Sequence, residues 1–212
     1  MDMEYYIHII ISSRMIDSLT LLSRCCCFRM CITMRTWLPL LNTKPAVIFT
    51  YRHPLEVAMS LAKRQNFKLA YGLRLWMQYN KAAVLNSADL CRVLSSNNAI
   101  LADPLSETKR IANELTTKCN VPSPPRTIDQ VVVESFVDTS LQHNRNKLKE
   151  KEADEKVLAQ HGDCIVKDFE SKELEGSPQY ERDMDLYLKA MKLYCDFESG
   201  EAYKAAYEWP EV

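Results

Sequence analysis

One arginine and one serine stand at positions where together they can hold a phosphate. Arg52 follows the run Ala46–Tyr51, which is short, β-branched and aromatic, and Ser60 lies eight residues after Arg52. A guanidinium binds a phosphate through two parallel hydrogen bonds, and a serine hydroxyl can add another. Pro54 suits the first position of a helix, where free backbone N–H groups attract an anion. The order strand, Arg-His-Pro, helix therefore predicts a phosphate site.

The elements that must position these side chains can also be predicted. Ala46–Tyr51 is apolar on both faces, which is typical of a parallel strand covered by helices. The apolar periodicity further predicts a helix from Pro54, helices over about residues 70–87 and 105–118, a strand over 92–96, and a closing helix over 184–207 with a turn at Ser199-Gly200. This alternation indicates an α/β fold. In open α/β sheets, ligands gather at the carboxyl ends of the strands, where Arg52 is expected.

Residues 47–60 resemble the 3′-phosphate motif of sulfotransferases that use 3′-phosphoadenosine 5′-phosphosulfate. In that motif a strand-end Arg and a Ser eight positions later hold the 3′-phosphate, and Arg52 and Ser60 match this spacing. The similarity spans about residues 37–122 and includes Leu101-Ala102-Asp103-Pro104. It implies a partial P-loop-like three-layer fold with a parallel sheet flanked by helices. It also implies transfer of a sulfuryl group to a hydroxyl or amine of a small-molecule or carbohydrate acceptor.

The family's other motif is a glycine-containing loop after the first strand, which cradles the 5′-phosphosulfate. Glycine lets backbone N–H groups turn toward the anion there. The first glycine of this chain is Gly72, after Arg52. We therefore expect the first strand, loop and helix of the fold to be missing or altered, through a shortened amino terminus or a true loss of activity. Whether the chain is an enzyme stays open at this point.

The alternative function is a non-catalytic sulfotransferase-like remnant or interaction module. Arg52 would then be a helix-start arginine paired with a carboxylate such as Glu56, and Ser60 an ordinary polar residue of a helix. A nucleotide kinase is excluded, because it needs a P-loop that the sequence lacks.

A general base for the transfer is the least defined part of the site. His143 lies in a segment that the resemblance places on the acceptor side, and we take it as the candidate catalytic residue. His53 is next to Arg52 but more often such a residue shapes the turn. His161 lies in a loop-like segment. Arg29 and Arg35 either border the site or lie on a helix surface.

Composition restricts the partners and the compartment. Lys and Arg total 27 against 28 for Asp and Glu, so no overall positive field favours nucleic acid. The early apolar run Ile7–Ile11 is too short to span a bilayer. With an acidic start that does not suit a secretory signal, we expect no membrane span and a cytoplasmic location. The expected organisation is a divergent segment (1–35), a sulfotransferase-like core (36–143), a charged helix or linker (144–183) and a helical segment (184–212).

The eight cysteines are expected to be reduced, because a domain of this size does not need disulfides to fold. Cys25, Cys26 and Cys27 with Cys31 form the one cluster. Three adjacent cysteines do not easily converge on one tetrahedral ion, so we predict no metal site.

Overall fold

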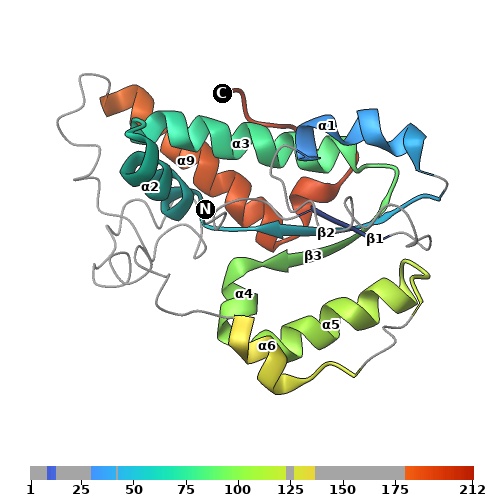
Figure 1. Ribbon diagram of the computed structural model, residues 1–212. Helices are drawn as coiled ribbons and strands as arrows, with labels where there is room; N and C mark the ends of the chain where they lie inside the picture. The colour runs from blue at the N-terminus through green and yellow to red at the C-terminus, as the bar shows by residue number, and fades with distance from the viewer. Residues whose placement is uncertain (1–8, 13–29, 42, 123–126, 137–179) are drawn as a thin grey trace. The chain divides into compact units, whose positions relative to one another are not determined.

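The computed structural model describes residues 9–12, 30–41, 43–122, 127–136 and 180–212 (Figure 1). The chain forms two compact units. The first contains Met1–Arg52 and Tyr79–Thr139, and the second contains His53–Gln78 and Ser140–Val212. The chain passes from the first unit to the second directly after Arg52.

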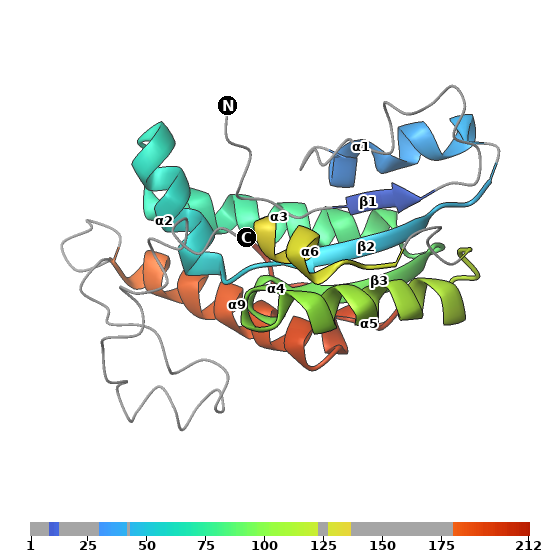
Figure 2. The same cartoon turned by 60° about the horizontal axis from the view of Figure 1, so that its bottom comes forward.

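The sheet lies in the first unit and has the order β1-β2-β3 (Figure 2). Its strands are β1 (Ile9–Ser12), β2 (Ala46–Tyr51) and β3 (Cys91–Ser96). β2 and β3 run parallel, with Ala46 opposite Cys91 and Tyr51 opposite Ser96. Within β2 the side chains of Val47, Phe49 and Tyr51 are buried. The predicted parallel strand over residues 46–51 is confirmed.

β1 was not predicted from the sequence. It pairs antiparallel with β2, with Ile9 opposite Phe49 and Ser12 opposite Ala46. The sheet is therefore mixed and only the β2–β3 pair is parallel. A strand of four residues carries too few side chains for a period to be recognised, and its pairing depends on a segment more than thirty residues away.

Two helices of the first unit begin at residues whose side chains cap them. The Ser96 hydroxyl accepts a hydrogen bond from the Ala99 N–H at the start of α4 (Asn97–Ala102). The Asp103 carboxylate accepts one from the Ser106 N–H at the start of α5 (Pro104–Thr117). These caps satisfy N–H groups that have no acceptor within the helix. The remaining helices of this unit are α1 (Met30–Trp37), the 3-10 turn η1 (Leu38–Leu40), α6 (Gln130–Phe136) and the second part of α3 (Leu69–Asn86).

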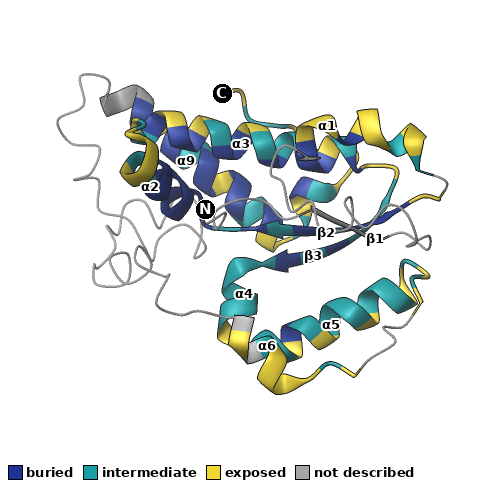
Figure 3. Cartoon of the chain, in the orientation of Figure 1, coloured by how far each residue is buried: buried dark blue, intermediate teal, exposed yellow. Residues whose placement is uncertain are grey.

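The second unit is built from helices that share an aromatic core. It contains α2 (Pro54–Gln65), the first part of α3, α9 (Tyr180–Glu198) and the 3-10 turn η4 (Glu201–Tyr203). Trp76 of α3 contacts Phe197 of α9, with ring centroids 6.0 Å apart. Gly72 lets α3 approach α2 closely, because a Cβ atom at this position would lie 2.8 Å from the Ala58 Cα atom. Figure 3 shows the buried first turns of α2 and its exposed end.

The structure is α/β, with mostly helices and a two-stranded parallel pair flanked by helices. The predicted helices and the second strand are present, as α2, α3, α5, α9 and β3. α4 was not predicted. Within the described ranges, no helix is long and apolar enough to cross a membrane.

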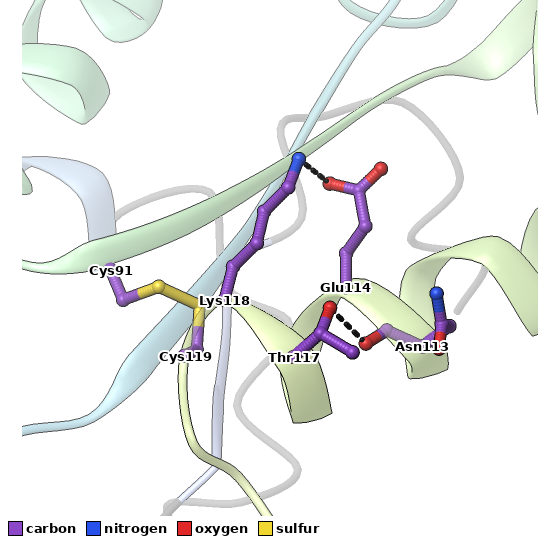
Figure 4. Close-up of a disulfide and its surroundings, with 6 residues drawn as sticks. All are labelled: Cys91, Asn113, Glu114, Thr117, Lys118 and Cys119. Atoms are coloured by element: carbon purple, nitrogen blue, oxygen red, sulfur yellow. Dashed lines mark hydrogen bonds and ion pairs between the residues drawn. A yellow bond between two sulfur atoms is a disulfide. The ribbon is translucent and has the colours of Figure 1, made fainter.

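A disulfide corrects the expectation of reduced thiols. Cys91, the first residue of β3, is bonded to Cys119, just beyond α5, with their Cα atoms 5.4 Å apart (Figure 4). Cys195 is also disulfide-bonded. Composition cannot reveal such a pair, because its geometry depends on how α5 returns along β3. Disulfides are typical of oxidising compartments, so these bonds do not favour the predicted cytoplasmic location.

Candidate functional site

Arg52 lies where the sequence predicted, directly after the carboxyl end of β2. His53 is the residue before α2, with φ −52° and ψ 128°, and Pro54 occupies the first turn of the helix. The first intrahelical hydrogen bond runs from the Val57 N–H to the His53 carbonyl. The geometry of an α-helix leaves the N–H groups before this bond pointing out of the helix end, where the dipole favours an anion. The strand-to-helix connection therefore has the order that the sequence predicted, and phosphate binding at this place stays a prediction.

Ser60 lies on α2 and is 4% exposed. Arg52 is the last residue of the first unit, whereas Ser60 belongs to the second. The strand that precedes Arg52 and the helix that carries Ser60 are confirmed. Their joint action on one ligand stays a prediction.

His53 packs as a core residue. Its side chain is 4% exposed, and its ring lies with its centroid 5.2 Å from that of Tyr194 on α9, in an edge arrangement. Both residues belong to the second unit. This contact favours the interpretation that His53 shapes the turn, and we assign it no role in proton transfer.

The other residues singled out in the sequence fall into two groups. Arg35 is exposed on α1 and its guanidinium donates to the Leu85 carbonyl at 3.3 Å, which suits a helix-surface arginine. The remaining ones lie outside the described residues, namely His143, His161, Arg29 and the cysteines Cys25, Cys26 and Cys27. The part of the chain that the structure describes contains no group of three or more His, Cys, Asp or Glu side chains that could hold a metal ion.

A polar cluster that the sequence analysis missed ties the carboxyl end of β3 to α5. We call Ser95, Glu107 and Arg110 the β3–α5 clamp. The Ser95 hydroxyl donates to Glu107 Oε1 at 2.6 Å. Arg110 binds both oxygens of Glu107, through Nη2 at 2.6 Å and Nε at 2.8 Å. The same Nη2 also donates to the backbone carbonyl of Leu94 at 2.6 Å, so the clamp holds both the side chain and the backbone of the strand.

The two charged groups of the clamp are ionised, and both oxygens of the Glu107 carboxylate accept hydrogen bonds. The Arg110 guanidinium, followed by the Ser95 hydroxyl, holds the pKa of the Glu107 carboxyl below its usual range despite its burial. Glu107 in turn raises the pKa of Arg110, which keeps the guanidinium charged. A carboxylate that already accepts bonds from two partners and has a lowered pKa is a weak base. Glu107 therefore suits a structural role, not general-base catalysis.

Only part of this cluster carries a signal in the sequence. Glu107, Arg110 and Glu114 follow one another at spacings of three and four on a predicted helix, which indicates ion pairs along one face. Arg110 does bind Glu114 as well, at 2.6 Å. The contribution of Ser95 depends on how α5 lies against β3, and no local pattern encodes that arrangement.

Comparison of the chain with protein-family models, with curated proteins and with solved structures finds no match. A function for this chain is therefore inferred from the residues of the site and from the sequence resemblance already described.

Proposed function

We propose that this chain is a sulfotransferase-family protein that binds the 3′-phosphate of 3′-phosphoadenosine 5′-phosphosulfate. Arg52 supplies the charged contact and Ser60 a further hydrogen bond. The observation that carries the proposal is the order of elements around Arg52: a buried parallel strand, one arginine, then a helix that begins at Pro54. An arginine between the end of a strand and the start of a helix is a combination suited to a phosphate, since the guanidinium and the N–H groups of a helix start both attract anions.

The transfer step is a further part of the proposal. With a 5′-phosphosulfate loop present, the family's chemistry is transfer of a sulfuryl group to a hydroxyl or amine, here of a small-molecule or carbohydrate acceptor. The residues before Arg52 contain no glycine for that loop. The second candidate is a non-catalytic member that retains the fold as an interaction module.

Titration calorimetry with 3′-phosphoadenosine 5′-phosphate separates the two candidates. Adenosine 5′-phosphate is the control ligand, because it differs from 3′-phosphoadenosine 5′-phosphate only in lacking the 3′-phosphate. The first candidate predicts tighter binding of the 3′-phosphorylated ligand, and the second predicts no binding of either.

Substitution of Arg52 tests the assigned residue. Loss of a charged hydrogen bond costs about 1.5–3 kcal/mol, so Arg52→Ala should weaken binding of 3′-phosphoadenosine 5′-phosphate by roughly ten- to 150-fold. Binding of adenosine 5′-phosphate should change little, because it has no 3′-phosphate to lose. Arg74→Ala is the control, since Arg74 is an exposed arginine of α3. An unchanged preference for the 3′-phosphate in Arg52→Ala would remove Arg52 from the site.

A further inference from the structure

The β3–α5 clamp lies close to Arg52 within the first unit. Leu94 and Ser95, the two residues of β3 that it holds, are opposite Phe49 and Thr50 of β2. Arg52 follows Thr50 by two residues. The clamp thus fixes the strand beside the one that carries the proposed phosphate ligand, and at the same end.

A second connection joins the same two elements at the other end of the strand. The Cys91–Cys119 disulfide holds the first residue of β3, opposite Ala46, to the end of α5. The strand is therefore attached to α5 at both of its ends, by a covalent bond at the amino end and, at the carboxyl end, by the hydrogen bonds that Ser95 donates to Glu107 and that Arg110 donates to the Leu94 carbonyl.

Stability alone is a poor explanation for the ion pair. The pair joins residues three positions apart on α5, and the Arg110 side chain is 39% exposed, so solvent screens the pair and it contributes little to stability. What the bidentate Arg–carboxylate contact adds is a fixed orientation, because both partners are planar and meet through two parallel hydrogen bonds. A fixed orientation is useful where a strand end must present a ligand.

We infer that Glu107 and Arg110 are positioning residues for the phosphate site. They hold the carboxyl end of β3, and through the parallel register the end of β2, in the arrangement in which Arg52 binds the 3′-phosphate. This inference rests on the proposed function. Neither residue contacts the nucleotide, and both act through Arg52.

The test compares the two attachments of β3. Glu107→Gln and Arg110→Lys break the bidentate pair with small changes in volume, and Cys91→Ser/Cys119→Ser breaks the disulfide. The readout is the ratio of the dissociation constants of adenosine 5′-phosphate and 3′-phosphoadenosine 5′-phosphate, measured by calorimetry. We expect the clamp variants to lower this ratio about threefold to tenfold, as for residues coupled through a shift of the backbone. The disulfide variant should melt at a lower temperature and keep the ratio.

A double-mutant cycle with Arg52→Ala distinguishes a positioning role of the clamp from a purely structural one. The quantity compared is the same ratio of dissociation constants, measured with and without Arg52. If Glu107 acts through Arg52, Glu107→Gln should have no further effect on the ratio in the Arg52→Ala background. Ser95→Ala deletes one hydroxyl and leaves the ion pair, and it replaces Glu107→Gln if that variant fails to fold. We expect it to lower the ratio in the same direction.

The possible outcomes distinguish failure of the positioning role from failure of the proposed function. Retention of the wild-type ratio in the clamp variants, with Arg52→Ala still impaired, overturns the positioning role and leaves the proposed function standing. A loss that is equal in the clamp and disulfide variants also overturns it, because general loosening then explains both. Absence of any 3′-phosphate preference in the wild-type chain removes the proposed function, and the positioning role with it.

Discussion

Removal of the Cys91–Cys119 disulfide should destabilise the fold by an amount that follows from its place in the chain. The bond joins residues 28 positions apart. In the chain-entropy account, opening a loop of this length gives the unfolded chain freedom equivalent to about 3.5 kcal/mol. For a chain of this size, each kcal/mol corresponds to about 2–4 °C, so Cys91→Ser/Cys119→Ser should melt roughly 7–14 °C lower.

The assay is urea unfolding and scanning calorimetry of the double variant and of both single variants. Cys91→Ser and Cys119→Ser each remove the same bond, so we expect the double variant to lose no more stability than either single variant. Such strong non-additivity is the signature of two directly coupled residues. Addition of a reductant is not an equivalent experiment, because it also opens the disulfide of Cys195.

Two results would refute this reasoning. Losses that add up in the double variant would show that the two side chains contribute separately by packing. Peptide mapping without reductant would also decide the matter, if it recovered the peptides of Cys91 and Cys119 apart from one another.

Two further perturbations test the packing and the clamp. Gly72→Ala places a Cβ atom 2.8 Å from the Ala58 Cα atom, so it should lower the free energy of unfolding by about 1–3 kcal/mol, measured in urea. The second perturbation is a change of pH, which tests the clamp because Arg110 lowers the pKa of Glu107 in the folded state. Its stabilising contribution is therefore complete above the unfolded pKa of about 4.3 and is lost as the pH falls through the lower folded value. The midpoint of urea unfolding should therefore decrease as the pH is lowered from about 6 to about 3. It should decrease less steeply in Glu107→Gln, which has no carboxylate at this position to protonate.

Elements with local signals could be predicted from the sequence. Pro54 and Asp103-Pro104 mark helix starts because proline lacks an N–H and an aspartate can accept one, and the structure begins α2 and α5 at Pro54 and Pro104. The strand Ala46–Tyr51 was recognisable because β-branched and aromatic residues filled both of its faces.

Features that depend on distant segments could not be predicted. β1 contains four residues and gains its place only by pairing with β2. The Cys91–Cys119 bond and the contact between Ser95 and Glu107 both require α5 to lie along β3, which no spacing in the sequence specifies. Of the candidate site, the position of Arg52 was predictable because it depends on a strand and a helix that are adjacent in sequence. The clamp was not, because its two halves meet only through the tertiary fold.

The charge of the clamp bears directly on the proposed phosphate site. The chain carries a net charge of −1, so an anion must be attracted by a local positive field. Glu107 bonds to Ser95, whose partner across the sheet lies two residues before Arg52, and an uncompensated carboxylate there would repel a phosphate. The guanidinium of Arg110 compensates this charge, with distances of 2.6 and 2.8 Å to the two carboxylate oxygens. Arg110 also binds Glu114, whose charge is balanced in turn by Lys118 at 2.7 Å. A carboxylate at this edge of the sheet is therefore compatible with phosphate binding, because the Arg110 guanidinium compensates its negative charge.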